Sequence, residues 1–370
     1  MKRKILCVIG TRPEAIKMMP VVQCLRQTAG VKTIVCTTAQ HRQMLDQVLS
    51  LFDITPAVDL NLMKPNQTLA EVTAAIFTHL DPVFRDLRPD RVLAQGDTTT
   101  VMVTAILAYY NRVHFGHVEA GLRTGDKFQP FPEEVNRMVA GVIADLHFAP
   151  TDWAKQNLIR ENIPENQIVV TGNPIIDALQ QVAQKTSPLE VDTIIKRNAD
   201  KHIILVTAHR RENFGRPLEN ICAALQRIAE ENTNSVQIVY PVHPNPNVRE
   251  IVYQRLRGIT NITLLPPLDY LPMVHLMKNA YLILTDSGGI QEEAPTFGVP
   301  VLVLRNVTER PEGIRAGVSK LVGTEVESIT SQTRLLLQDK NAYQKMARSA
   351  NPYGDGRAAQ RIVDAILNAY

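Results

Sequence analysis

The chain has 370 residues, of which 45% are hydrophobic and 21% are charged, and its formal net charge is +3 at pH 7. This balance is typical of folded globular domains and excludes the disordered, collagen-like and coiled-coil classes. At roughly 100–200 residues per domain the length predicts two domains, with three as the alternative. The small net charge gives no support to a nucleic acid or an anionic membrane as partner, so an anionic ligand needs locally placed cations.

The cysteine spacing and the hydropathy pattern predict a cytoplasmic protein. Cys7, Cys24, Cys36 and Cys222 form no CxxC pair, so buried free thiols are expected rather than disulfides or a zinc site. The apolar run at residues 5–9 is too short for the hydrophobic part of a signal peptide. No apolar stretch approaches the ~20 residues of a membrane-spanning helix, so we expect no membrane insertion.

In the first half of the chain, short β-branched runs alternate with longer helical patterns. Strands are predicted at residues 4–9, 34–38, 91–94 and 113–118, and helices at residues 14–27, 69–87 and 98–110. Alternation of this kind is typical of βαβ units, which build a parallel sheet. The last of these helices is apolar nearly all round, as expected of a helix packed against a sheet.

The same pattern restarts in the second half and predicts a second doubly wound domain. Strands are predicted at residues 202–207, 236–240, 281–285 and 300–304. The join lies within residues 172–188, so we assign residues 1–172 to an N-terminal Rossmann-like domain and residues 173–353 to a C-terminal one. The turn-rich sequence NPYGDG at 351–356 precedes apolar residues at helical spacing. We expect this last helix, about residues 354–370, to pack back on the first domain.

Polar and charged side chains directly follow several predicted strands, which is where ligands bind in open α/β sheets. The candidates are Arg12, Lys17, Asp97, Glu119, His209, Arg211, His243 and Ser287. Each has a structural alternative: Asp97 precedes three threonines and suits a helix N-cap, Glu119 could be a solvated carboxylate, and either histidine could be structural. Because two carboxylates, two histidines and several arginines gather at the same sheet edges, the pattern favours an active site.

Ser287, Gly288 and Gly289 follow an apolar strand and begin a helical stretch. Backbone N–H groups at a helix N-terminus bind phosphate, and glycine lets a phosphate approach closely, although an ordinary tight turn is the alternative. Arg12 and Arg310 are candidates for bidentate contacts with a pyrophosphate. The motifs GxGxxG and GxxxxGKS/T are absent, which disfavours a dehydrogenase and a P-loop NTPase. No Asp/His set has metal-ligand spacing, so we expect no metal.

Nine longer motifs follow one another along the chain. They are GTRPEAIK (10–17), TAQHR (38–42), GDTTT (96–100), HVEAGLR (117–123), PEE (132–134), HRREN (209–213), TDSGGIQEEAP (285–295), TERP (308–311) and NPYGDG (351–356). Together they resemble the non-hydrolysing UDP-N-acetylglucosamine 2-epimerases, which interconvert UDP-GlcNAc and UDP-ManNAc. The resemblance implies the GT-B fold, in which two Rossmann-like domains hold the active site between them, and it implies no cofactor.

The resemblance also implies which residues act on the nucleotide sugar. The family's catalytic positions match Asp97, Glu119, Glu133 and His209. Its UDP-sugar contacts match Arg12, Lys17, Leu268, Met273, Ser287, Gly288, Gly289, Glu293 and Arg310. The route attributed to the family eliminates UDP to leave 2-acetamidoglucal, and then adds UDP back after a proton has reached the other face of C2. Carboxylates beside the ring and cations at the pyrophosphate are what this chemistry requires.

Bacterial members of the family bind a second UDP-GlcNAc as an activator, and the resemblance extends to that site. The matching residues are Gln40, Gln43, Glu133, Arg211 and His243, whereas Asn66 replaces a further arginine. We therefore expect activation by UDP-GlcNAc, but without the charge-assisted hydrogen bonds that an arginine at position 66 would donate. Relatives are commonly homodimers that serve the synthesis of cell-envelope polysaccharides, and the same is expected here.

Three alternatives stay open. A hydrolysing 2-epimerase would release free ManNAc, and a GT-B glycosyltransferase would use UDP-GlcNAc as a donor. A transferase needs at most one base, so the group of three carboxylates disfavours it. A catalytically dead nucleotide-sugar sensor is the third alternative, and the presence of all three carboxylates disfavours that as well.

Overall fold

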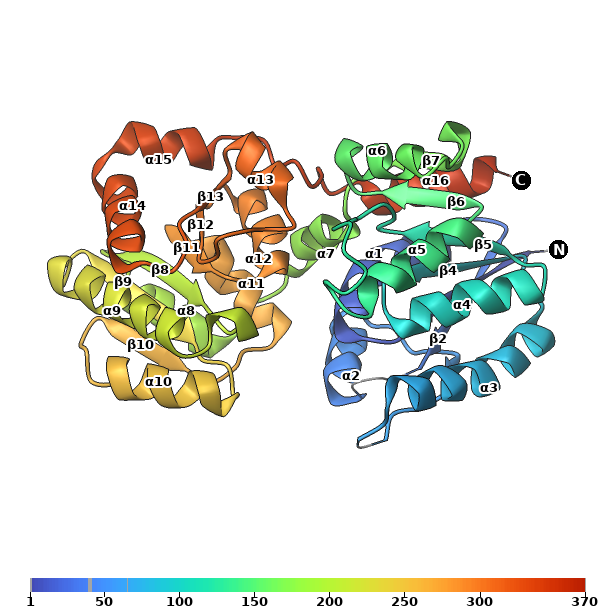
Figure 1. The fold of residues 1–370 in the computed structure, drawn as a ribbon, viewed down its shortest axis with the longest axis horizontal. Coiled ribbons are helices and arrows are strands. Elements are labelled where there is room, and N and C mark those ends of the chain that lie inside the picture. Colours follow the sequence, from blue (N-terminus) through green and yellow to red (C-terminus); the bar gives the residue numbers. More distant parts are fainter. Residues whose placement is uncertain (1, 39–41, 65, 370) are drawn as a thin grey trace. The chain divides into compact units, whose positions relative to one another are not determined.

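The computed structural model describes residues 2–38, 42–64 and 66–369, with the side chains of 42–44 excepted (Figure 1). The chain forms two compact units. Unit 1 comprises Met1–Ala178 with Tyr353–Tyr370, and unit 2 comprises Leu179–Pro352. The division therefore falls inside helix α7 (Pro174–Val182), a few residues beyond the boundary expected from the sequence.

Unit 1 contains a seven-stranded parallel sheet in the order β3-β2-β1-β4-β5-β6-β7. The strands are β1 (Arg3–Ile9), β2 (Val31–Thr37), β3 (Val58–Asp59), β4 (Arg91–Gln95), β5 (His114–Val118), β6 (Leu146–Ala149) and β7 (Ile168–Val170). The strand order reverses between β1 and β4, and ligands of open α/β sheets bind at such a switch point. The loops after β1, β4 and β5 are therefore placed for function.

Helices complete unit 1, and several begin with sequence-encoded caps. They are α1 (Arg12–Gln27), α2 (Arg42–Leu51), α3 (Leu69–Leu87), α4 (Thr99–Tyr110), α5 (Glu133–Ile143), α6 (Asp152–Arg160), the short 3-10 helix η1 (Glu165–Gln167), α7 and α16 (Ala358–Asn368). In α1, the Thr11 hydroxyl accepts from the Glu14 N–H and the Glu14 carboxylate accepts from the Thr11 N–H, which is a capping box. The C-terminal helix α16 packs against α1.

Unit 2 contains a six-stranded parallel sheet in the order β10-β9-β8-β11-β12-β13. Its strands are β8 (His202–Thr207), β9 (Val236–Pro241), β10 (Ile262–Leu265), β11 (Leu282–Thr285), β12 (Val301–Val303) and β13 (Ser319–Leu321). Its helices are α8 (Leu189–Arg197), η2 (Arg211–Asn213), α9 (Arg216–Glu231), α10 (Pro246–Leu256), α11 (Tyr270–Asn279), α12 (Gly288–Glu293), η3 (Ala294–Phe297), α13 (Pro311–Ala316), α14 (Val326–Gln338) and α15 (Lys340–Ala347). Two parallel α/β units are what the sequence predicted.

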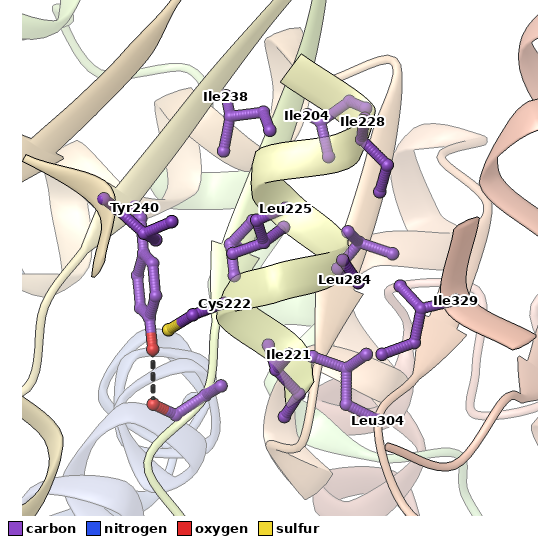
Figure 2. Close-up of a cluster of buried hydrophobic side chains, with 14 of the residues drawn as sticks. Ile204, Ile221, Cys222, Leu225, Ile228, Ile238, Tyr240, Leu284, Leu304 and Ile329 are labelled. Atoms are coloured by element: carbon purple, nitrogen blue, oxygen red, sulfur yellow. Dashed lines mark hydrogen bonds between the residues drawn. The ribbon is translucent and has the colours of Figure 1, made fainter. Parts of the chain in front are cut away.

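The core of unit 2 positions the loop after β8. Figure 2 shows Ile221, Leu225 and Ile228, which share one face of α9, directed into the buried cluster. Full burial of such side chains stabilises the fold by about 1.5–3 kcal/mol each. Tyr240 of β9 is wholly buried, and its hydroxyl donates to the Ala208 carbonyl at 2.7 Å (Figure 2). This bond fixes the backbone directly before His209.

No helix in the described part of the chain is both long enough and apolar enough to cross a lipid bilayer.

Candidate functional site

In unit 1, Glu119 directly follows β5, and three donors from separate segments hold its carboxylate. Lys17 Nζ of α1 lies 2.5 Å from Oε1, and Asn173 Nδ2 donates to the same oxygen at 2.8 Å. Gln95 Nε2, at the end of β4, donates to Oε2. Glu119 is 6% exposed, and its φ of 63° lies in the left-handed region, which costs a non-glycine residue about 1–2 kcal/mol. Donors on both oxygens fix the orientation of the Glu119 carboxylate and offset the cost of burying it.

The orientation of the Asn173 amide is fixed by a second hydrogen bond. Asn173 Oδ1 accepts from the Ile175 N–H at 3.1 Å, so the NH₂ group is the one that faces Glu119. The Asn173 N–H donates to the Tyr353 carbonyl at 2.7 Å, in the segment where the chain re-enters unit 1. One residue thus connects this returning segment to the candidate catalytic carboxylate.

Asp97 follows β4 and pairs with Arg137 of α5, whose Nη2 lies 2.6 Å from Oδ2. Thr98 occupies the N-cap position of α4, so the N-cap alternative for Asp97 is wrong. Burial raises the pKa of Asp97, Arg137 opposes that shift, and Glu119 raises the pKa further. Asp97 is therefore protonated more readily than an ordinary aspartate.

Glu133 and Glu134 begin helix α5 and have different surroundings. Glu133 is half-buried and contributes to the raised pKa of the Asp97 carboxyl. The carboxylate of Glu134 is almost wholly buried and accepts from the N–H groups of Thr124 and Gly125, each at 3.0 Å. Glu134 therefore holds the preceding loop in place, whereas the catalytic role predicted for Glu133 stays a prediction.

Glu14 is a buried carboxyl that was not among the predicted site residues. Its Oε2 accepts from the N–H groups of Gly10 at 2.5 Å and Thr11 at 3.2 Å, which closes the loop after β1. Burial raises the pKa of Glu14 to about 7, although the neighbouring hydrogen bonds oppose the shift. Arg12, a predicted substrate contact, lies half-buried in the first turn of the same helix.

In unit 2, His209 closely follows the buried residues of β8, and its ring stacks on His243. The two ring centroids are 5.0 Å apart and the rings are 9° from parallel. The N–H groups of His209 and Arg210 each donate to Asp286 Oδ2 at 2.8 Å. The loops after β8, β9 and β11 are thereby held together.

Arginines and carboxylates form a network around Gly288 in unit 2. Arg210 lies 3.0 Å from Glu309, and Arg310 is paired with Glu292. A Cβ built on Gly288 would lie 3.6–3.8 Å from the guanidinium groups of both arginines. Burial alone would raise the pKa of Glu309, but Arg210 and the other nearby arginines outweigh it and lower the pKa to about 2.

The helix that begins at Gly288 is α12, which has only six residues. Ser287 occupies its N-cap without a side-chain cap bond, and Gly289 is exposed. A helix of six residues carries a small dipole, so the guanidinium groups are the stronger attraction for an anion at this place. This weakens the helix-terminus interpretation of the Ser-Gly-Gly sequence, and the substrate contact predicted for Arg310 stays a prediction.

Two of the predicted UDP-sugar contacts, Leu268 and Met273, lie around the start of α11. Leu268 and Met273 are half-buried there. Tyr270, between them, donates from its hydroxyl to Glu293 Oε1 at 3.1 Å. Tyr270 therefore orients the carboxylate of Glu293, which is one of the predicted UDP-sugar contacts.

The predicted activator residues are only partly described. Gln40 and the side chain of Gln43 lie outside the described residues. Arg211 is exposed on η2, and His243 is exposed after β9, stacked on His209.

Three side chains that hold the candidate catalytic groups were missed by sequence reasoning. They are Gln95, Arg137 and Asn173. Gln95 and Asn173 stand at or just after strand ends, so the strand-end rule could have found them, but Arg137 has no local signal. Asp286 lies in the strand-end motif TDSGGIQEEAP, but the sequence assigned it no role. Among the described residues, no group of three or more His, Cys, Asp or Glu side chains is arranged to hold a metal ion.

Comparison with known proteins identifies relatives over almost the whole chain. The family model described as UDP-N-acetylglucosamine 2-epimerase matches residues 23–367. The UDP-N-acetylglucosamine 2-epimerase of Salmonella typhimurium is 54% identical over 371 residues, which cover 98% of each chain. The crystal structure of the UDP-GlcNAc 2-epimerase from Neisseria meningitidis bound to UDP-GlcNAc has 47% identity and a TM-score of 0.89, covering 99% of this chain and 100% of that one. A UDP co-structure of MnaA from S. aureus has 49% identity and a TM-score of 0.90, covering 99% and 96%. The structural neighbours confirm the predicted GT-B fold class.

Proposed function

Because the chain belongs to the UDP-N-acetylglucosamine 2-epimerase family, we propose that it inverts C2 of UDP-GlcNAc to give UDP-ManNAc, reversibly and without hydrolysis. Family membership supports the 2-epimerase activity and the nucleotide sugar. The non-hydrolysing course and the intermediate rest on the chemistry of the sugar and on the residues of each unit.

The reaction must overcome the low acidity of the C2 proton, which has no carbonyl beside it. If the C1–O bond to UDP breaks, its electron pair leaves with the diphosphate and positive charge develops at C1. The C2–H bond is then acidified, and a base can take the proton to leave 2-acetamidoglucal and UDP. Delivery of a proton to the opposite face of C2, with return of the diphosphate oxygen to C1, gives the epimer.

The observation that carries this proposal is that two carboxyl groups in unit 1 have different surroundings. Lys17, Asn173 and Gln95 hold the Glu119 carboxylate. Asp97 has a raised pKa and is protonated more readily than an ordinary aspartate. Two faces of C2 require one group that takes a proton and one that gives it, and pairs of carboxyls with separated pKa values serve such roles.

Unit 2 supplies groups suited to uridine diphosphate. The guanidinium groups beside Gly288 are paired with Glu309 and Glu292, and a diphosphate offers them the same bidentate acceptor geometry as a carboxylate. Glu293, oriented by Tyr270, can accept from the ribose hydroxyls. We assign the pyrophosphate to the arginines and the ribose to Glu293.

The test is incubation with UDP-GlcNAc in D₂O, followed by NMR and mass spectrometry of the sugars. The expected result is UDP-ManNAc together with deuterium at C2 of both nucleotide sugars. Glu119→Gln keeps the size of the side chain but cannot accept the proton, so it should lose the exchange by about 10²-fold or more. Turnover without deuterium at C2 would refute proton transfer at that carbon.

The same incubation separates the alternatives. Free ManNAc as the only new sugar would identify a hydrolysing enzyme, and transfer to an acceptor without C2 exchange would identify a glycosyltransferase. Binding of UDP-GlcNAc without turnover would identify a sensor.

We also propose that UDP-GlcNAc activates the enzyme and that the protein is a homodimer. Starting from purified UDP-ManNAc alone, the reverse reaction should show a lag that added UDP-GlcNAc abolishes. Immediate full activity without UDP-GlcNAc would contradict activation, and a monomer mass by light scattering would contradict the dimer.

A further inference from the structure

Asp286 is a wholly buried carboxylate, and only one of its two oxygens takes part in holding the loops together. Its Oδ2 accepts three hydrogen bonds, from the N–H groups of His209 and Arg210 and from Asn213 Nδ2 at 3.0 Å. Its Oδ1 has no hydrogen-bond partner among the described residues. An unpartnered oxygen of a buried carboxylate is costly, so its place calls for a functional explanation.

The unpartnered oxygen faces the ring of His209. Asp286 Oδ1 lies 3.8 Å from His209 Nδ1, which a small rotation of the ring would shorten to a hydrogen bond. The carboxylate itself cannot turn away, because three donors fix Oδ2. The backbone of the loops after β8 and β11 therefore keeps the Asp286 carboxylate close to the His209 ring.

A second contact limits how the His209 ring can turn. His243 lies face to face with it, 5.0 Å away and 9° from parallel. The His243 ring is itself fixed, since its Nδ1 accepts from the Asn245 N–H at 3.2 Å. The stacking therefore restricts tilting of the His209 ring out of its present plane. The His209 side chain is 40% exposed, and with Nδ1 directed at a buried carboxylate, Nε2 is the nitrogen available to a ligand.

We infer that Asp286 is the positioning residue of His209, holding a proton on Nδ1 so that Nε2 acts on the substrate. This inference rests on the proposed function for its chemical consequence. As the C1–O bond breaks, its electron pair goes to the diphosphate oxygen, which takes the proton from Nε2 of the imidazolium. The ring is left neutral with its proton on Nδ1, hydrogen-bonded to Asp286. When the diphosphate oxygen returns to C1, that proton returns to Nε2.

Asp286→Asn is the direct perturbation. The asparagine Oδ1 can keep the three donors that Oδ2 has in the wild type, and its NH₂ group then faces His209 Nδ1. A facing donor turns Nδ1 into an acceptor and moves the proton of the neutral ring to Nε2. In the serine proteases a buried aspartate holds the catalytic histidine in the correct tautomer, and its replacement by asparagine selects the wrong one.

The first measurement is the tautomer of His209 in the ligand-free protein, by long-range ¹H–¹⁵N NMR of histidine-labelled samples at alkaline pH. The chain has nine histidines, so the His209 signal is assigned by its loss in His209→Gln. The wild type should carry the proton on Nδ1 and Asp286→Asn on Nε2. Asn213→Ala is the matched control, because it removes a donor to the same carboxylate without facing the ring, and its His209 proton should stay on Nδ1.

The second measurement is the steady-state kinetics of Asp286→Asn. We expect kcat to fall by about 10²-fold or more with KM little changed, because the proton transfer and not binding is affected. A wild-type ring with its proton on Nε2 would overturn the inference, even if the variant does not fold. Wild-type kcat in a folded Asp286→Asn would overturn it too. If the wild type shows no epimerisation, the proposed function fails, while the tautomer measurement still decides the positioning role.

Discussion

Replacing Asn173 by serine tests whether the clamp on Glu119 organises catalysis. Serine lacks the amide that donates to Glu119, but its hydroxyl can still accept from the Ile175 N–H, which keeps the local turn. The backbone bond from residue 173 to Tyr353 is unaffected by the side chain. The substitution therefore removes one donor and little else.

The size of the effect follows from the hydrogen bond that the serine variant cannot make. The Asn173–Glu119 hydrogen bond is 2.8 Å long and buried, with exposures of 1% and 6% for the two residues. A hydrogen bond to a charged group contributes about 1.5–3 kcal/mol, and about 1.4 kcal/mol corresponds to a factor of ten in rate. If the clamp acts mainly in the transition state, kcat/KM should fall by about 10- to 150-fold.

The assay is epimerisation of UDP-GlcNAc in D₂O, with the melting temperature measured in parallel. Asn261→Ser is the matched control, because Asn261 is also a buried asparagine whose amide donates at 2.9 Å, to the Ala229 carbonyl in unit 2. Both variants should lose stability, but only Asn173→Ser should lose activity. Equal activity of the two variants would refute the reasoning that this donor holds Glu119 for catalysis.

Three further predictions concern stability. The folded protein holds the Glu14 proton up to about pH 7, whereas an unperturbed glutamate carboxyl has a pKa of 4.5, so this group's stabilising contribution is lost as pH rises between those values. Glutamine does not titrate, so the melting temperature of Glu14→Gln minus that of the wild type should rise between about pH 5 and about pH 8. A difference that does not change with pH would contradict the burial argument. Gly121→Ala should lower the free energy of unfolding in urea by about 2–4 kcal/mol, because φ is +89° and the new Cβ would collide with the Ala154 carbonyl. Gly30→Ala is the control, since Gly30 has φ +80° but open space around it, and it should cost only about 1–2 kcal/mol. Similar values for the two variants would show that the backbone relieves the collision. Asp177→Ala removes the carboxylate that accepts from the first two N–H groups of α16, those of Ala359 at 2.9 Å and Ala358 at 3.1 Å. The variant should lose about 1–2 kcal/mol of unfolding free energy, and hydrogen exchange at the start of α16 should become faster. Unchanged exchange would show that the carboxylate does not cap α16.

Strand ends could be predicted because the sequence changes from apolar to polar residues where a buried strand ends. The strand predicted at residues 202–207 is β8, His202–Thr207, and the polar residues that follow it are His209 and Arg211. The switch from apolar to polar residues at each such end also located Asp97 and Glu119. Five strands of two to four residues were not predicted: β3, β6, β7, β10 and β13. Such short runs show no period, whereas β11 and β12, which are also short, lie in the longer apolar runs at 281–285 and 300–304.

The sequence by itself determined two parallel α/β units and the charged residues that follow their strands, because hydrophobic period and strand ends are local properties of the chain. Only the tertiary structure decided how those residues are paired. Lys17, expected to contact substrate, reaches Glu119 across 102 residues of sequence, and Asn173 reaches the same carboxylate across 54. Asp286 meets His209 across 77. Such partners are chosen by the order of strands in a sheet, which brings distant loops to one edge, and no local pattern records that order.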